Sequence, residues 1–136
     1  MAERASVDTQ VELTDDGVLG KTVRHAIQHL DTFSKPAGVS RVILTTDEGT
    51  SLCPKTDQPD TWSCEIDYQP KNKCLESKSL KLYIWRFRNA GAFCEELAAR
   101  IAFDVMKHVE PTSVKVTIKQ ALRGGIAIYS IAELQE

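Results

Sequence analysis

The segment 93-FCEELAARIAFDVMKHV-109 carries the clearest pattern in the chain. Its apolar side chains recur every four residues on one helical face, at Phe93, Leu97, Ile101 and Val105. Pro111 ends the pattern, because proline cannot continue a helix. The segment predicts an amphipathic helix that packs its apolar face onto another layer of structure.

Apolar and polar residues alternate on both sides of this helix, as they do in β-strands. Residues 61–70 (TWSCEIDYQP) and 113–120 (SVKVTIKQ) show this alternation. Residues 39–46 (VSRVILTT) are rich in β-branched side chains and lead into the turn-like DEGT. Near the C-terminus, LRGG turns the chain into a last strand at 126–134 (IAIYSIAEL). Four strands are therefore expected.

A first helix precedes the long one. Helical spacing relates four apolar residues, Leu80, Tyr83, Ile84 and Phe87. Asn89 and Gly91 predict the end of this helix. The order strand, strand, helix, helix, strand, strand predicts an α+β fold, in which two helices cover one face of a four-stranded antiparallel sheet. The other face and the two sheet edges favour a ring-like homo-oligomer.

Length and composition limit the class of protein. The chain has 136 residues, a net charge of -2 and 42% hydrophobic residues, as a single soluble domain has. Residues 1–20 are polar, acidic and aperiodic and predict a flexible arm, which leaves residues 21–136 as the domain. With neither a membrane-length apolar run nor a signal sequence, the chain is expected in the cytoplasm, without a membrane partner. Its balanced charge argues against nucleic acid as a direct partner.

The cysteine and histidine spacings predict no metal site. The cysteines include no C-x-x-C pair; they are Cys53, Cys64, Cys74 and Cys94. His25 and His29 would share one side of an N-terminal helix, but no third ligand accompanies them.

Cys53 is the first candidate for chemistry. It lies in 51-SLCPKTDQPD-60, a loop rich in proline and aspartate, where Lys55 favours the thiolate. Asp60 follows in the same loop and could donate a proton to whatever the thiolate attacks. The alternatives are a loop thiol without a role and an aspartate that serves only the turn. Cys64, on an apolar strand face, is expected in the core.

Glu95 and two lysines each allow two interpretations. Glu95 is favoured near the start of a helix by the helix dipole, or it could anchor the amide edge of a planar heterocycle. Lys78 and Lys81 lie on adjacent helical turns, where two cations hold an anionic cofactor or merely solvate the surface.

Four motifs together resemble one enzyme family. SLCPKTDQPD, ESKSLKLY followed by FRN, then FCEE and RGGI have the order and approximate spacing of the NADPH-dependent 7-cyano-7-deazaguanine reductases, the nitrile reductases of queuosine biosynthesis. The resemblance runs from about Thr50 to Ile128. ESKSLKLY is its most specific part, because it separates these reductases from other tunnelling-fold enzymes such as GTP cyclohydrolase I. The resemblance implies a tunnelling fold with sites built between neighbouring subunits.

The resemblance also implies residue roles. Cys53 matches the nucleophile that adds to the nitrile carbon of 7-cyano-7-deazaguanine as a covalent thioimide, and Asp60 matches the general acid and base that protonates the nitrile nitrogen. Two hydrides from NADPH would then yield 7-aminomethyl-7-deazaguanine. Family positions that contact the substrate match Glu95, Glu76 and Ser77, and those that contact the NADPH phosphates match Lys78, Lys81 and Arg123.

Position 94 departs from the family. Where the family has Phe-His-Glu, this chain has Phe93, Cys94 and Glu95, and cysteine lacks the cationic form of histidine. The change predicts weaker hydride transfer, while thioimide formation by Cys53 and Asp60 survives. Cys94 stays a catalytic candidate by its position. It is either a tolerated small residue or the partner of Cys53 in a reversible disulfide.

Two other functions fit the same motifs. An amidine-forming transferase of the archaeosine type would make the same thioimide and let ammonia attack it. A non-catalytic protein would only hold the deazaguanine, covalently or not. ESKSLKLY favours the reductase, because that motif has no purpose without NADPH.

Overall fold

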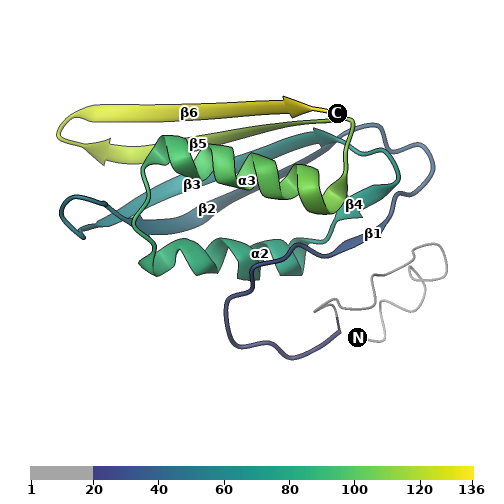
Figure 1. Cartoon of the computed structure of the whole chain (residues 1–136), viewed down its shortest axis with the longest axis horizontal. Coiled ribbons are helices and arrows are strands. Elements are labelled where there is room, and N and C mark those ends of the chain that lie inside the picture. The colour runs from purple at the N-terminus through teal and green to yellow at the C-terminus, as the bar shows by residue number, and fades with distance from the viewer. Residues whose placement is uncertain (1–19) are drawn as a thin grey trace.

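The computed structural model describes residues 20–136, and the fold it shows is a sheet covered on one face by two helices (Figure 1). The four-stranded antiparallel sheet has the order β2-β3-β5-β6, and β1 pairs with β4 in a small second sheet. The elements are β1 (Thr32–Ser34), β2 (Val42–Leu52), β3 (Pro59–Gln69), β4 (Lys73–Leu75), α2 (Ser77–Trp85), the 3-10 helix η1 (Arg86–Asn89), α3 (Cys94–Val109), β5 (Ser113–Arg123) and β6 (Ile126–Gln135). The predicted α+β architecture is confirmed. The predicted arm, residues 1–20, lies almost wholly outside the described residues.

The core lies between the sheet and the helices. On β3 the buried side chains alternate with exposed or half-buried ones, because successive side chains of a strand point to opposite faces. Leu97, Ile101 and Val105 of α3 pack against this sheet face, as their four-residue spacing predicts, whereas Phe93 is the N-cap and is 43% exposed. The buried set includes Trp62, Cys64, Ile66 and Tyr68 on β3, Val114, Val116 and Ile118 on β5, and Leu97, Ile101 and Val105 on α3.

Two local predictions are wrong. DEGT is not a turn, because β2 continues through it to Leu52 with a register shift between Thr46 and Gly49. Gly49 is needed there: a Cβ at this position would lie 2.1 Å from the Trp62 ring. The segment with His25 and His29 forms no helix, and His29 Nε2 lies 3.1 Å from Asp31 Oδ1 instead.

Three segments that are far apart in the sequence meet at one end of the molecule, at the left of Figure 1. They are the loop after β2 (residues 53–58), the segment that leads into α3, and the β5–β6 hairpin. Backbone hydrogen bonds join the first two, since Leu52 N donates to Ala90 O at 2.9 Å and Ala92 N donates to Leu52 O at 3.1 Å. The hairpin turns at Gly124 and Gly125, whose positive φ angles of 62° and 79° suit glycine.

Neither a membrane-spanning helix nor a metal-binding cluster occurs in residues 20–136. No helix in residues 20–136 is long and apolar enough to cross a membrane. Over the same residues, no group of three or more His, Cys, Asp or Glu side chains could hold a metal ion.

Candidate functional site

Cys53 is the first residue after β2, inside a loop that closes on itself. Cys53 N donates to Gln58 O at 2.9 Å, and Asp57 N donates to Cys53 O at 2.9 Å. Asp57 has a left-handed φ of 57°, which lets the chain turn back toward β3 within a few residues. The Cys53 side chain is 4% exposed, so the loop and its neighbours cover the sulfur.

Hydrogen-bond donors lower the pKa of Cys53 to about 7. The largest contribution comes from the Thr56 hydroxyl, followed by the backbone N–H groups of Lys55 and Thr56, and Arg123 adds a smaller one. These donors stabilise the thiolate and outweigh desolvation, which acts in the opposite direction. Near neutral pH these donors favour the thiolate of Cys53, which is the form in which a thiol attacks an electrophile. The prediction from sequence named Lys55 for its charge, whereas the structure uses its backbone and the hydroxyl of Thr56.

Asp60 lies beside this thiol on β3. It pairs with Ser51 across the β2–β3 ladder, and its side chain is buried. Arg123 Nη1, at the end of β5, donates to Asp60 Oδ1 at 2.6 Å. Arg123 and Cys53 also act on each other: the guanidinium lowers the pKa of the thiol, and the thiolate raises the pKa of the guanidinium. The structure thus brings Arg123, from the RGGI motif, to Asp60 and the loop of Cys53, which share the motif SLCPKTDQPD.

Cys94 is the first residue of α3 and is only 2% exposed. Ser130 Oγ on β6 donates to Cys94 Sγ at 3.1 Å, and Cys94 Sγ lies 3.7 Å from Ile118 O on β5. Desolvation is the largest cause that raises the pKa of this thiol. Cys53 and Cys94 are both free thiols here, and the disulfide between them stays a prediction. The contact with Ser130 had no signal in the sequence, because it depends on how β6 aligns with α3.

The remaining predicted residues lie at the starts of the two helices, Glu95 in α3 and the others in or next to α2. Glu95 is exposed in the first turn of α3, at the same end of the molecule as Cys53. Glu76 caps the start of α2 instead: its Oε1 accepts from Lys78 N and its Oε2 from Ser79 N, both at 2.7 Å. The Lys78 ammonium donates to Lys21 O. Sequence analysis missed the capping role, because the usual N-cap residues are Ser, Thr, Asp and Asn and not glutamate.

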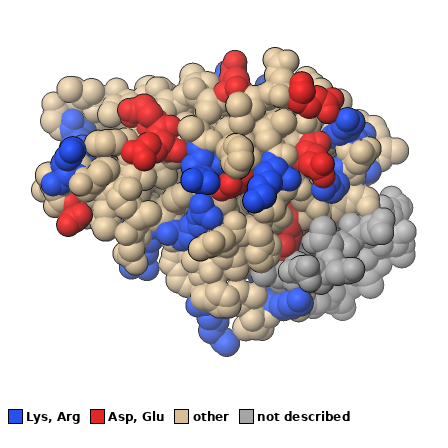
Figure 2. Space-filling view, in the orientation of Figure 1, with Lys and Arg blue, Asp and Glu red and all other residues tan. Residues whose placement is uncertain are grey.

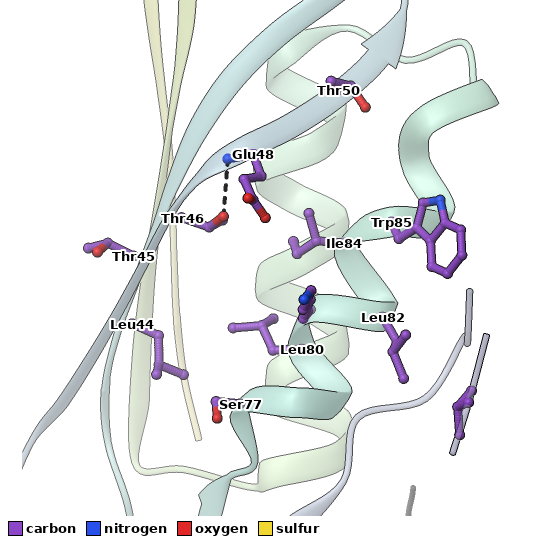
Figure 3. A pocket seen from close by; sticks show the side chains of 12 residues that line it. Leu44, Thr45, Thr46, Glu48, Thr50, Ser77, Leu80, Leu82, Ile84 and Trp85 are labelled. Carbon is purple, nitrogen blue, oxygen red and sulfur yellow. Dashed lines mark hydrogen bonds between the residues drawn. The ribbon is translucent and has the colours of Figure 1, made fainter. Parts of the chain in front are cut away.

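A groove of about 520 Å³ runs between α2 and β2 (Figure 3). Its polar wall includes Ser77 and Lys81 from α2 and Thr46, Glu48 and Thr50 from β2. Trp85 stands at the end of the groove near Thr50, and Ser77 at the other end. An ammonium group and several hydroxyls are donors that fit phosphate oxygens, and an indole face fits a planar ring. Glu48 is an anion in the same wall, and much of the remaining lining is apolar, including Leu44, Leu80 and Ile84. Lys81 and the hydroxyls are the groups of this groove that fit a phosphate-bearing cofactor such as NADPH.

The Ser77 end of the groove lies far from the cysteine, whereas Thr50 at the other end is three residues before it. The nine residues of α2 and the four of η1 separate Ser77 from Ala90, which is bonded to the residue before Cys53. Helical rises make this separation about 20 Å. Glu76 and Ser77 therefore cannot touch the same small base as Cys53 of the same chain. Around these sites, acidic and basic groups are interspersed on the surface (Figure 2).

Several known proteins are similar to this chain in sequence or in structure. The family model described as QueF-like protein matches residues 59–136. Proteins named NADPH-dependent 7-cyano-7-deazaguanine reductase are similar: that of Nitrosomonas europaea is 43% identical over 78% of each chain. That of Helicobacter pylori is 44% identical over 80% of this chain and 78% of its own. The crystal structure of an archaeosine synthase QueF-Like in the apo form matches with a TM-score of 0.67 and 30% identity, over 71% of this chain and 94% of that one.

Proposed function

This chain belongs to the QueF-like family, and on that premise we propose that it reduces the nitrile of 7-cyano-7-deazaguanine to a primary amine with NADPH. The observation that carries the proposal is the Cys53 thiol, whose pKa is lowered to about 7 and which shares Arg123 with Asp60. A soft thiolate adds to a conjugated nitrile, and a neighbouring carboxylate can move the proton that the addition requires. The names of relatives at about 43% identity support the same substrate and cofactor.

In the first step, the Cys53 thiol adds across the nitrile. A bond forms between Cys53 Sγ and the nitrile carbon, one carbon–nitrogen π bond breaks, and the nitrogen takes a proton. Asp60 accepts the thiol proton and passes it to that nitrogen, so the step is balanced without another reactant. The product is the covalent thioimide on Cys53.

NADPH, when bound, supplies a hydride to this carbon in each of two reduction steps. The chain's own residues release and regenerate the nucleophile: the carbon–sulfur bond breaks after the first step, and Cys53 leaves as a thiolate. Asp60 is placed to transfer protons to the nitrogen. Cys94 contributes no such transfer, because its thiol is buried against Ser130 and its pKa is raised.

Lys81 would hold the cofactor phosphates in the groove between α2 and β2, with Lys78 beside it. Trp85 offers a planar ring of the cofactor an aromatic face. Arg123, the third basic position implied by the resemblance, has donors beyond those that bind Asp60 and Cys53, because a guanidinium carries five N–H groups.

The substrate site is completed by a second copy of this chain. Cys53, Asp60 and Glu95 lie at one end of the molecule, whereas Glu76 and Ser77 start α2 about 20 Å away. All of them can contact one base only if Glu76 and Ser77 come from a neighbouring subunit. Glu95 would then bind the pyrimidine edge beside Cys53 of its own chain.

A second candidate is the amidine-forming transfer of the archaeosine type, which starts from the same thioimide. One observation favours it: the archaeosine synthase structure is similar to this chain over 94% of its own length. The two candidates differ in what attacks the thioimide carbon, which is hydride in one case and ammonia in the other.

The decisive experiment mixes the purified protein with 7-cyano-7-deazaguanine and NADPH and follows the absorbance of NADPH. We expect decay that disappears in Cys53→Ala and persists in Cys74→Ala, a buried thiol outside the site. A Cys53-dependent mass adduct without decay would contradict the reductase. Ammonium added to that sample distinguishes transfer, which releases an amidine, from mere retention of the deazaguanine.

A further inference from the structure

Arg123 connects two groups of the site that the β-ladder does not itself bring together. It is the last residue of β5, directly before the hairpin at Gly124 and Gly125. Its Nη1 lies 2.6 Å from Asp60 Oδ1, and the guanidinium also lowers the pKa of the Cys53 thiol. The Asp60 side chain is 7% exposed and that of Arg123 is 49% exposed. The guanidinium therefore reaches a covered carboxylate and a covered sulfur from the surface of the molecule.

The chemistry of the pair requires such a group. A thiolate and a carboxylate side by side repel each other, and each loses water when it is covered. A guanidinium compensates both charges, since its planar fork can donate to two acceptors at once and stays charged at every relevant pH. A lysine ammonium at this place would keep the charge but not the fork.

We propose that Arg123 is a positioning residue that holds the Cys53 sulfur and the Asp60 carboxylate together as a pair before any ligand binds. The proposal rests on the proposed function only in that Cys53 is the nucleophile. It adds a role to a residue that the resemblance connected only with the phosphates of the cofactor. A phosphate contact alone would leave the free thiol unchanged when Arg123 is replaced.

The other charged groups near the pair come from two segments, α3 and the loop 53–58. Glu95, in the first turn of α3, lies at the same end of the molecule as Cys53. Lys55 and Asp57 belong to the loop that carries Cys53, and Lys55 acts on the sulfur through its backbone. Asp60 comes from β3 and Arg123 from β5. The third neighbour, the segment 90–92 that bonds to Leu52, brings only Ala, Gly and Ala. A change in the pH behaviour of Cys53 on replacement of Arg123 therefore reports the loss of that guanidinium.

The test is the pH profile of Cys53 alkylation by iodoacetamide, followed by peptide mass in the absence of nitrile and NADPH. Arg123→Gln and Arg123→Lys are compared with the wild type and with Arg41→Gln. Arg41 is the matched control, because it pairs with Asp67 between β2 and β3 at the other end of the sheet. The limiting rate at high pH reports access to the sulfur, and the midpoint reports the thiolate, so the two effects separate.

We expect the midpoint to stay at about 7 in Arg41→Gln and to rise by about half a pH unit in Arg123→Gln, because the Thr56 and Lys55 donors remain. Alkylation at pH 7, relative to the limiting rate, would then fall about twofold. The alkylation midpoint of Arg123→Lys should lie between those of the wild type and Arg123→Gln, because lysine retains the positive charge. Equal alkylation midpoints in Arg123→Gln and Arg41→Gln would overturn the proposal. If a separate activity assay then showed that Arg123→Gln only raised KM for NADPH, the role of Arg123 would be limited to the cofactor. Because neither nitrile nor NADPH is present, this result is independent of whether the protein proves to be a reductase.

Discussion

The four cysteines have different thiol pKa values because their surroundings differ. Hydrogen-bond donors lower the pKa of Cys53 to about 7, whereas burial raises that of Cys64 to about 12. Burial also raises the pKa of Cys74 and of Cys94. A charged thiolate is stable only where donors replace the water that it loses. The reactive thiol is therefore distinguished by its loop, not by its residue type.

This difference predicts selective alkylation of the wild type. At pH 7 iodoacetamide should modify Cys53 first, because the thiolate is the nucleophile and about half of Cys53 is ionised there. The rate should fall tenfold per pH unit well below 7 and level off above about 8. Cys64 and Cys94 should remain unmodified until the protein unfolds. Peptide mapping across pH 5 to 9 measures this order, and equal rates at all four thiols would contradict it.

At the scale of elements, β2 and β3 are held in register by a close contact inside the sheet. The irregular register of β2 brings the backbone of Gly49 against the ring of Trp62, and Trp62 Nε1 donates to Ser51 Oγ at 3.1 Å. Ser51 in turn pairs with Asp60. The contact between a glycine and an indole therefore supports the strand that positions Asp60.

Gly49→Ala should destabilise the protein by about 1–3 kcal/mol, because the new Cβ overlaps an immobile ring. Gly91→Ala is the control, since its Cβ would come no closer than 3.6 Å to another atom. Urea unfolding at one fixed protein concentration measures both variants. Equal midpoints for the two variants would mean that the indole moves aside without cost.

At the scale of the whole molecule, the sheet leaves apolar groups exposed on its C-terminal strands. Ile126, Tyr129 and Ile131 on β6 are each more than half exposed. β2 and β6 are the edges of the sheet, and their outer backbone groups lack partners within it. Together with a divided substrate site, these edges support assembly from several copies.

Subunit complementation tests the shared site. Cys53→Ala and Ser77→Tyr should each be inactive, since one removes the nucleophile and the other adds bulk at an exposed site residue. Unfolded together and refolded as a mixture, they should regain about a quarter of the wild-type activity, because random assembly pairs the two intact residues at that frequency.

The two variants refolded separately and then combined serve as the control. No recovery in mixed assemblies would place the whole site within one chain. A monomer in size-exclusion chromatography at micromolar concentration would contradict assembly itself.

Sequence periodicity predicted most of the fold. The four-residue spacing from Phe93 to Val105 placed α3, and the alternation from Trp62 to Tyr68 placed β3. Its errors are local. DEGT has the composition of a turn, but it continues β2, where Gly49 packs against the ring of Trp62. The sequence of β2 alone contains no pattern that indicates this contact.

The sequence by itself determined the layers of this protein and its candidate chemical groups, because burial periodicity and residue chemistry are local properties. Only the tertiary structure decided which groups meet. Arg123 reaches Asp60 across 63 positions, and Ser130 reaches Cys94 across 36. Such contacts depend on the register of β3, β5 and β6 and on the position at which α3 packs against the sheet. For that reason Arg123, which the family resemblance connects with the cofactor phosphates, lies in the structure against Asp60.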